Sequence, residues 1–399
     1  MWQTFLSERL QQAQEQDAVR RREANDGADG RTLLINGRRA VNFSGNDYLG
    51  LSRHPAVIRA WCDGTRQYGV GSGGSGHVTG YTTAHRDLEQ MLAEWLGFDR
   101  AILFVSGFSA NQAVITALMQ RGDHLICDKL AHASIMEAAM HSPAEFSRFH
   151  HNDTAHLSTR LSRTENSTRL SRTENSTGKT LVVTEGIFSM DGDAAPLAAI
   201  LPLTRQHNAR LMADDAHGIG VCGREGRGSC DAAGIRPDIQ IVTFGKAVGV
   251  SGAAVLCDAQ TADYLTQYAR HLIYSTTFPA AQACAIQAAV REIRRGDGLR
   301  DTLAENIRFF RERVAHLPLQ LLPSASAIQP LIVGDNRAAL ALSHYLQERG
   351  LWVKAIRPPT VPPNTARLRI TLTSAHHRDD ITQLTEALDA FCRHYRPCE

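Results

Sequence analysis

The stretch Val242-Thr243-Phe244-Gly245-Lys246 is the starting point for predicting the fold of this chain. Residues 239–244 are apolar and β-prone, so they predict a strand that ends at Gly245 and leaves Lys246 at its tip. Residues 247–254 are small and glycine-rich, which lets backbone or a flat ligand approach closely. A lone lysine after a strand is usually a solvated surface residue, so this stretch alone assigns Lys246 no special role.

Two upstream strands also end in polar residues. Residues 211–213 lead into Asp214-Asp215-Ala216-His217, and residues 182–184 lead into Glu185. The carboxyl ends of parallel strands meet at one edge of a sheet, where open α/β folds bind their ligands. The three strand ends therefore predict a shared site that contains Lys246.

Composition narrows the class of protein. The 399 residues are 43% hydrophobic and 21% charged, which is ordinary for a globular chain with more than one domain. The net charge of +2 favours neither nucleic acid nor a membrane surface as a partner. We expect no secretory signal at the N-terminus and no membrane span, because no apolar run approaches roughly 18 residues. Eight scattered cysteines without a Cys-x-x-Cys pair argue against zinc and favour a cytoplasmic protein with free thiols.

Apolar strands alternate with helical patterns along most of the chain. This alternation predicts the α/β class, with a mostly parallel sheet covered by helices on both faces. Expected strands and helices include residues 85–96, 101–105, 110–119, 125–128, 133–140, 180–183, 197–207 and 211–213. We expect an N-terminal arm over 1–45, a large domain over 46–279, and linking helices with a small α/β domain over 280–399. The last part is expected to hold helices over 280–293, 303–317, 337–349 and 379–395, and strands over 328–333, 352–356 and 366–373.

The N-terminal arm has two local signals. Residues 1–25 read as an amphipathic helix that ends in Arg20-Arg21-Arg22, and Asn36-Gly37 predicts a hairpin turn. The arginine triplet is either a solvated helix end or an electrostatic grip on an anionic substrate.

Two glycine-containing turns have different interpretations. Residues 71–76, GSGGSG, match the dinucleotide pattern G-x-G-x-x-G, but residues 63–68 before them do not form a buried strand. We therefore expect a close-packed active-site loop there. Ser106-Gly107-Phe108 joins the strand 101–105 to the helix 110–119, and free N–H groups at such a helix N-terminus favour a phosphate. Gly107 is alternatively only a tight turn.

A perfect repeat interrupts the alternation. Residues 160–168, RLSRTENST, recur unchanged as residues 169–177. Two polar copies are too few for a repeat architecture, so we interpret them as a tandem duplication in a surface connection or at a helix end.

Pyridoxal phosphate chemistry accounts for the residues at the three strand ends. A lysine forms a Schiff base with this aldehyde cofactor, which also needs an acid at its ring nitrogen and polar groups at O3′. Lys246, Asp214 and His217 supply these groups in turn. Asp214, Asp215 and His217 are alternatively metal ligands, or Asp214 is a plain helix N-cap. The cofactor's phosphate would be held by N–H groups of Gly107 and Phe108 and by hydroxyls of Ser189 and Thr243.

The spacing between residues 214–217 and 243–246, with residues 184–192 upstream, resembles the α-oxoamine synthases. These fold-type I pyridoxal phosphate enzymes join an amino acid to an acyl thioester with loss of carbon dioxide. The resemblance covers about residues 17–390 and implies a sheet of the seven-stranded type and a homodimer with its site at the interface. Residues 73–81 and 356–362 are most similar to the biotin-biosynthetic member, whose substrates are L-alanine and pimeloyl-CoA or pimeloyl-acyl carrier protein. The duplicated nonapeptide departs from the family, whose members are shorter there.

The resemblance also implies roles for individual residues. Lys246 carries the Schiff base, His132 stacks over the cofactor ring, and Glu185 lies among the cofactor's neighbours. Taken alone, His132 is more typical of a helix N-cap neighbour or a core residue. Arg369 would hold the substrate carboxylate as a bidentate pair. The remaining implied residues are Asn46 beside Arg369, Arg20 and Thr360 along the acyl path, and Thr277 at the partner's phosphate.

Three rival functions remain open on the sequence. One is another member of the same family, such as glycine C-acetyltransferase. A second is a nucleotide-binding module that uses residues 71–76. A third is a catalytically silent relative, against which the intact Lys246, Asp214 and Arg369 argue.

Overall fold

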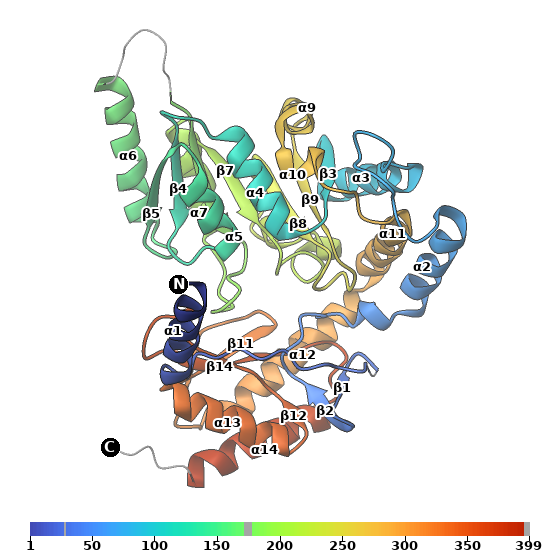
Figure 1. The fold of residues 1–399 in the computed structure, drawn as a ribbon, viewed down its shortest axis with the longest axis vertical. Helices are drawn as coiled ribbons and strands as arrows, with labels where there is room; N and C mark the ends of the chain where they lie inside the picture. The colour runs from blue at the N-terminus through green and yellow to red at the C-terminus, as the bar shows by residue number, and fades with distance from the viewer. Residues whose placement is uncertain (28, 171–177, 395–399) are drawn as a thin grey trace. The chain divides into compact units, whose positions relative to one another are not determined.

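The computed structural model describes residues 1–27, 29–170 and 178–394, which form two compact units (Figure 1). The larger unit consists of Leu51–Ser189 and Ala194–Gly298, and the smaller of Met1–Gly50, Met190–Asp193 and Leu299–Glu399. These two units are groups of residues in close contact, and they do not test where independently folding domains begin and end. The division into three domains that the sequence suggests therefore stays a prediction.

A seven-stranded sheet forms the centre of the larger unit. Its order is β3 (Arg100–Phe104), β9 (Ala253–Cys257), β8 (Ile239–Thr243), β7 (Arg210–Asp214), β6 (Thr180–Glu185), β4 (His124–Asp128) and β5 (Glu145–Phe149). Strands β8, β7, β6, β4 and β5 pair in parallel, while β9 is antiparallel to both of its neighbours. The mostly parallel α/β sheet expected from the sequence is confirmed. Strands β5 and β9 are not among those expected from the sequence.

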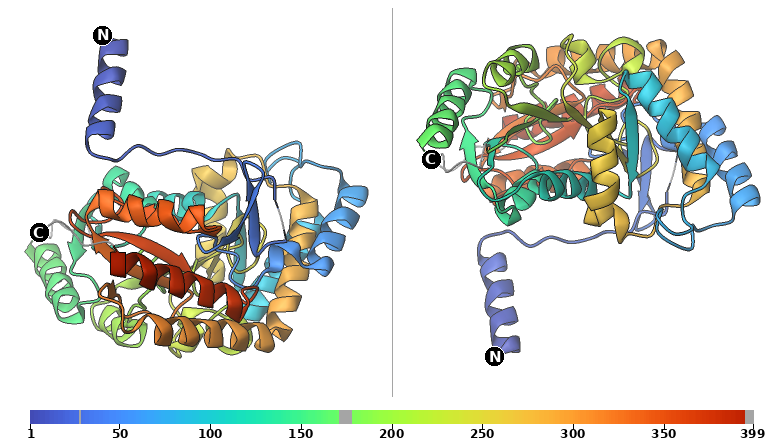
Figure 2. Two further views of the ribbon diagram at one scale, coloured as in Figure 1. Left: turned by 90° about the horizontal axis from the view of Figure 1, so that it is seen from below. Right: turned by 90° about the horizontal axis from the view of Figure 1, so that it is seen from above.

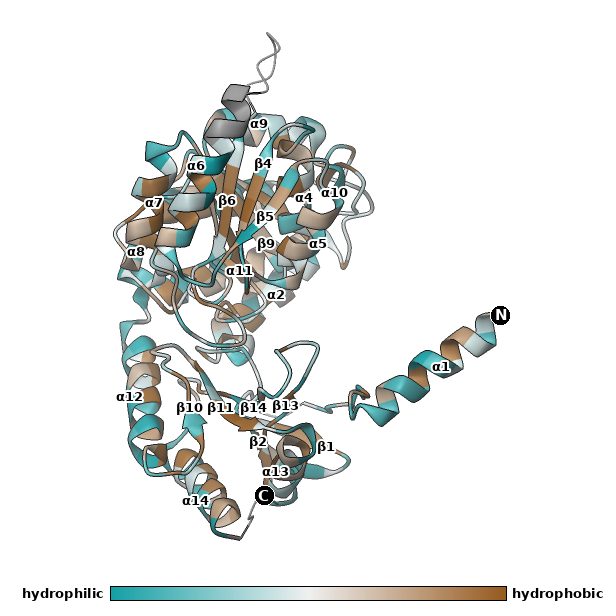
Figure 3. Cartoon of the chain, turned by 90° about the vertical axis from the view of Figure 1, so that its left-hand side faces the viewer, coloured by the Kyte–Doolittle hydropathy of each residue, from teal (hydrophilic) through white to brown (hydrophobic). Residues whose placement is uncertain are grey.

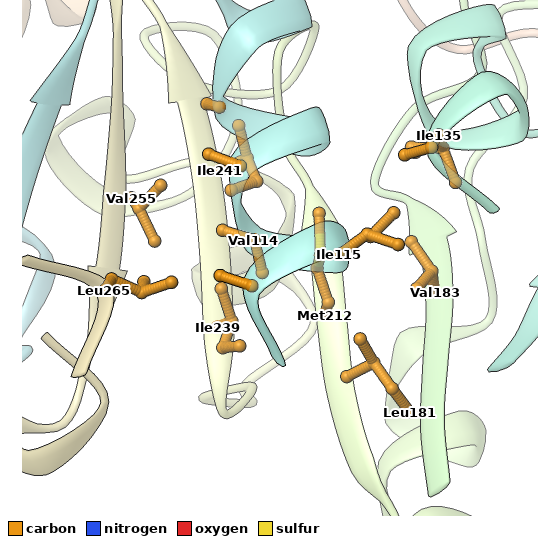
Figure 4. Packing of buried hydrophobic residues seen from close by; sticks show 14 of the residues in the cluster. Val114, Ile115, Ile135, Leu181, Val183, Met212, Ile239, Ile241, Val255 and Leu265 are labelled. Carbon is orange, nitrogen blue, oxygen red and sulfur yellow. The ribbon is translucent and has the colours of Figure 1, made fainter. Parts of the chain in front are cut away.

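Helices cover both faces of this sheet because its central strands carry apolar residues on both sides. In β6, Leu181 and Val183 join one core cluster and Val182 joins the other. Figure 4 shows Val114 and Ile115 of α4 packed against Met212, Ile239 and Ile241 of the strands. Fully burying such a side chain stabilises the fold by about 1.5 to 3 kcal/mol. The helices are α2 (Pro55–Tyr68), α3 (Thr83–Leu96), α4 (Gly107–Leu118), α5 (Ala133–His141), α6 (Thr154–Leu170), α7 (Leu197–Gln206), α8 (Ser229–Ala232), α9 (Ala259–Tyr268), α10 (Arg270–Ile273) and α11 (Ala280–Arg295), with 3-10 turns at Leu51–Arg53 and Arg224–Gly226.

The smaller unit contains two sheets. One is antiparallel, in the order β10 (Gln320–Leu321), β11 (Ile328–Gly334), β14 (Ala366–Thr371) and β13 (Ala355–Ile356). The other consists of β1 (Thr32–Ile35), β2 (Arg38–Asn42) and β12 (Leu351–Trp352). Its helices are α12 (Asp297–Val314), α13 (Asn336–Glu348) and α14 (Arg378–His394). The single strand predicted over 352–356 is wrong, because β12 and β13 pair in different sheets.

The N-terminal arm differs from expectation in one respect. The Asn36-Gly37 hairpin is confirmed, since Ile35 pairs with Arg38 across a two-residue turn. The helix over 1–25 is wrong in extent, because α1 spans Trp2–Glu15 and the chain then bends at Asp17, whose φ is 50°. Arg20-Arg21-Arg22 is therefore not a helix end. Figure 2 shows α1 standing apart on an extended segment, and no residue of this described helix is buried. Its apolar and polar stretches are visible in Figure 3.

Residues 71–76 form a loop after α2, which agrees with rejecting the dinucleotide motif. The Thr277 main-chain N–H donates to Gly74 O (3.0 Å), and the Ser72 hydroxyl donates to Thr277 O (2.5 Å). The first copy of the nonapeptide lies in α6, and residues 171–177 of the second copy lie outside the described residues. Across the described chain, no helix combines the length and apolarity that crossing a bilayer requires. The seven cysteines within the described residues are free thiols.

Candidate active site

Lys246 lies three residues after β8, at the carboxyl edge of the sheet, and is half-buried. Main-chain hydrogen bonds shape the turn that presents it: Gly249 N–H donates to Lys246 O (2.8 Å) and Val250 N–H to Phe244 O (2.8 Å). Gly249 has a φ of 74°, and a Cβ there would come within 2.3 Å of Ser52 N. The tight turn therefore requires glycine, which explains the small residues that follow the lysine.

Asp214 ends β7, the strand beside β8, and is 5% exposed. Asn111 Nδ2 on α4 donates to Asp214 Oδ2 (2.7 Å), and the Ala216 main-chain N–H donates to Oδ1 (3.0 Å). Asn111 also donates to the hydroxyl of Ser134 (2.9 Å). Asn111 was not among the predicted site residues. The signal that could have identified it is a polar residue in the first turn of a mostly apolar helix that follows a strand.

His132 is the N-cap of α5 and accepts a hydrogen bond from the Ser134 main-chain N–H through Nδ1 (3.3 Å). Burial lowers the pKa of His132, nearby Lys246 lowers it further, and Asp214 raises it. His132 is thus both the capping residue that its sequence context favours and a neighbour of Lys246 and Asp214. This places three of the predicted residues in one electrostatic cluster.

Two further carboxyl groups lie at the ends of β6 and β7. Burial raises the pKa of Glu185 well above its usual range, with Asp214 adding to the effect and Lys246 opposing it. Burial also raises the pKa of Asp215 to about 7. The Asp215 carboxylate accepts hydrogen bonds from Ser229 N–H (2.8 Å) and Gln240 Nε2 (2.9 Å). Among the residues that the structure describes, Asp214, Asp215 and His217 do not form a group of converging ligand atoms, so the metal-ligand alternative gains no support.

A small anion fits the N-terminus of α4. Ser106 caps this helix, and a Cβ at Gly107 would lie 2.5 Å from Thr243 Cγ2, so glycine allows Thr243 to lie close. Thr243 is 8% exposed, and its hydroxyl has no hydrogen-bond partner among the described residues. A buried hydroxyl beside helical N–H groups is what a phosphate requires. The other predicted residues here are exposed Phe108 on α4, half-buried Ser189 after β6, and buried His217 after β7.

The smaller unit places Arg369 and Asn46 together. Arg369, on β14, is 8% exposed and donates through Nη1 to Asn46 Oδ1 (3.2 Å) and Thr371 Oγ1 (3.2 Å). The Tyr48 hydroxyl donates to the same Asn46 oxygen (3.2 Å). Burial raises the pKa of Tyr48 to about 12, and Arg369 opposes this shift. Tyr48 was missed by the sequence analysis, although it is two residues from Asn46.

The predicted acyl-path residues are also neighbours within the smaller unit. Arg20 Nη2 donates to Thr360 Oγ1 (3.2 Å). Both residues line a cavity of about 650 Å³ whose wall also includes Arg21, Lys354 and Arg357. Arg357 donates to the main-chain oxygens of Asp17 and Val19 and so holds the arm against this cavity. Cations thus dominate the charge of the wall.

Comparison with known proteins agrees with this arrangement. Residues 38–388 match the family model for aminotransferase class I and II. An 8-amino-7-oxononanoate synthase from Cronobacter sakazakii is 58% identical over 98% of this chain and 100% of its own length. A serine palmitoyltransferase from S. paucimobilis, solved with a bound PLP–myriocin aldimine, superposes with a TM-score of 0.89 at 27% identity, over 98% of this chain and 97% of that one. The 8-amino-7-oxononanoate synthase of Francisella tularensis has a TM-score of 0.76 at 29% identity, over 89% and 98% of the two chains. The chain therefore belongs to the aminotransferase class I and II family and, within it, to the 8-amino-7-oxononanoate synthases.

Proposed function

We propose that this chain condenses L-alanine with a pimeloyl thioester, releasing carbon dioxide and the thiol, in the biosynthesis of biotin. The observation that carries the proposal is the cluster at the carboxyl edge of the larger unit's sheet. Lys246 and Asp214 end adjacent strands and both act electrostatically on His132 and Glu185. A lysine and a carboxylate at the same edge of the sheet supply the two groups that pyridoxal phosphate requires at its aldehyde carbon and its ring nitrogen.

The residues present fit this cofactor. The Thr243 hydroxyl, without a described partner, and the N–H groups of Gly107 and Phe108 would hold the phosphate. Lys246 would bind the aldehyde carbon, Asp214 the ring nitrogen and His217 O3′. When bound, pyridoxal phosphate withdraws electrons from the α-carbon of the amino acid. Ser189 and Glu185 complete the predicted contacts within one chain.

The chain's own residues then move the proton and hold the reactants. Once the amino group of alanine has replaced Lys246 at the aldehyde carbon, the freed Lys246 Nζ would take the α-proton of alanine as general base, and the α-carbon electron pair would form a bond to the thioester carbonyl carbon. The C–S bond breaks and the thiolate leaves. The bond to the carboxylate carbon breaks next, carbon dioxide leaves, and Lys246 returns a proton to the same carbon. His132 stacks over the reacting groups and limits their access to water.

Substrate recognition is assigned to the smaller unit. Arg369 would bind the alanine carboxylate as a bidentate pair, with Asn46 orienting the guanidinium. Arg20 and Thr360, on the cationic cavity of about 650 Å³, would bind an acyl chain that ends in a carboxylate. Both coenzyme A and acyl carrier protein remain acyl donors to be compared by assay.

We also propose a cytoplasmic homodimer with Thr277 reaching the partner's phosphate. Exposed apolar side chains support a second copy as the partner: Val78 and Tyr81 follow residues 71–76, and Phe108 and Tyr274 are exposed on the same unit. Sedimentation of the purified protein tests this part separately, because a monomer would contradict it without contradicting the chemistry.

The visible absorbance of the purified protein, before and after L-alanine is added, tests the proposed function. We expect a yellow protein whose spectrum responds to L-alanine and which turns over alanine with a pimeloyl thioester faster than glycine with acetyl-CoA. Lys246→Ala should lose the visible absorbance and turnover. Lys179→Ala is the matched control, because Lys179 lies just before β6, at the opposite edge of the sheet. Full turnover by Lys246→Ala, or preference for glycine with acetyl-CoA, would contradict the proposal.

A further inference from the structure

Glu185 and Asp214 are two acidic side chains at paired positions of adjacent strands. Glu185 is the last residue of β6 and Asp214 the last of β7, and the two are register partners in the parallel ladder. Register partners project from the same face with Cβ atoms about 5 Å apart. Two full negative charges at this separation in a buried site repel one another strongly.

The surroundings of Glu185 are those of a neutral acid. The residue is 2% exposed. The main-chain N–H of His132 faces its carboxyl group and opposes the effect of burial on its pKa, while Oε1 has no hydrogen-bond partner among the described residues. An ionised carboxylate needs several donors to replace water, whereas a protonated one needs an acceptor for its single O–H.

The charged groups that face Glu185 come from four elements. Asp214 at the end of β7 and Asp128 at the end of β4 are acidic and raise its pKa, in addition to the effect of burial. Lys246 after β8 and the N–H of His132 at the start of α5 oppose them. Asp214, by contrast, has both of its oxygens satisfied by Asn111 and Ala216. The surroundings therefore favour one anion, Asp214, in this pair.

We propose that Glu185 is a positioning residue that remains a neutral carboxylic acid at the working pH, holding the His132 main chain with one oxygen and presenting an O–H donor to the cofactor site with the other. The cluster then carries one negative charge on Asp214 opposite one positive charge on Lys246. Glu185 thereby fixes His132 without competing with Asp214 for the cofactor's ring nitrogen. This inference rests on the proposed function for the identity of the cofactor.

The pH titration of the holoenzyme's visible absorbance, which follows the Lys246 nitrogen, tests the charge of Glu185. Glu185→Gln keeps the shape and a donor, so removing a neutral acid should move the midpoint by less than about 0.3 pH unit. If Glu185 were ionised, the same substitution would remove a negative charge close to Lys246 and lower the midpoint by about 1 to 3 pH units, which would overturn the proposal. The turnover rate of Glu185→Leu should be about tenfold or more below that of wild type, whereas the turnover rate of Glu185→Gln should be close to that of wild type.

Infrared difference spectra provide a readout that is independent of turnover. Wild type minus Glu185→Gln should show the C=O stretch of a protonated carboxyl group at neutral pH. Loss of carboxylate bands instead would refute the inference. Should Glu185→Gln be insoluble, Glu89→Gln protein with glutamic acid carbon-13 labelled at its side-chain carboxyl gives the Glu185 band as an isotope shift. The Glu89→Gln background is needed because burial raises the pKa of Glu89 to about 7, so Glu89 would give a band of its own. These measurements need no thioester, so a failure of the proposed alanine–pimeloyl reaction would be recognised separately.

Discussion

Asp215→Asn should make the protein's stability less dependent on pH. Asp215 is fully buried, accepts hydrogen bonds from Ser229 and Gln240, and has a folded-state pKa of about 7 because burial penalises its charge. Its reference pKa is 3.8. The folded state therefore binds a proton that the unfolded state has released between these two values. Stability falls as the pH rises through this window and is level above it.

The size of the effect follows from the folded-state pKa. One pH unit within the window corresponds to about 1.4 kcal/mol of unfolding free energy. From about pH 5.5 to the pKa of about 7 is 1.5 units, so wild type should lose about 2 kcal/mol through this group on going to about pH 8. Asparagine has the same shape and no titrating proton, so Asp215→Asn should lose no unfolding free energy at this position over the same pH range.

Urea unfolding at about pH 5.5 and about pH 8, at saturating cofactor, measures this difference. The free-energy difference between Asp215→Asn and wild type should shift by about 2 kcal/mol in favour of asparagine at the higher pH. Asp258→Asn is the control. Burial alone would raise the pKa of this N-cap residue of α9, but hydrogen bonds from the main chain and side chain of Thr261 outweigh burial and lower it. That group is ionised at both pH values, so its substitution should cost the same at each. A pH-independent effect of Asp215→Asn would refute the reasoning.

Three further substitutions or deletions have distinct expected outcomes. Tyr48→Phe removes the hydrogen bond to the Asn46 oxygen that Arg369 shares, worth about 0.5 to 1.5 kcal/mol. The L-alanine concentration that gives half of the spectral change should therefore rise about 2- to 13-fold. An unchanged concentration would contradict the role given to Arg369. Gly107→Ala places a Cβ 2.5 Å from Thr243 Cγ2, so cofactor affinity, measured by equilibrium dialysis, should fall by about tenfold or more. Gly298→Ala is the control, because a Cβ there meets no atom within 4 Å. Deleting residues 169–177 keeps the first copy of the nonapeptide, which supplies buried Leu161, and halves the length of chain from Leu161 to Thr180. Halving a connection changes its closure entropy by about 0.6 kcal/mol, so the unfolding free energy should change by no more than this amount. A larger loss would mean that the second copy stabilises the fold.

Local sequence patterns predicted most of the helices and strands of the larger unit and the hairpin of the N-terminal arm. The alternation of apolar strands and helices identified β6, β7 and β8, and the Asn-Gly turn identified the β1–β2 hairpin. Strand β9 was missed because Ala253-Ala254 continue a small, glycine-rich segment that has no strand signal of its own. Its pairing with β3 and β8 makes it a strand. The arm's helix was predicted too long because the bend at Asp17 has no proline or glycine to announce it.

The placement of Lys246, Asp214 and Glu185 at strand ends was determined by the sequence alone, because a strand pattern that stops at a polar residue is a local signal. Tertiary structure decided which groups meet there. Asn111 reaches Asp214 across a separation of 103 residues, and Glu185 is buried with Asp214 as its register partner. These contacts depend on how α4 packs on the sheet and on which strands become neighbours. The charge of a buried carboxyl group depends on those neighbours, so it follows from the packed sheet and not from any single stretch of residues.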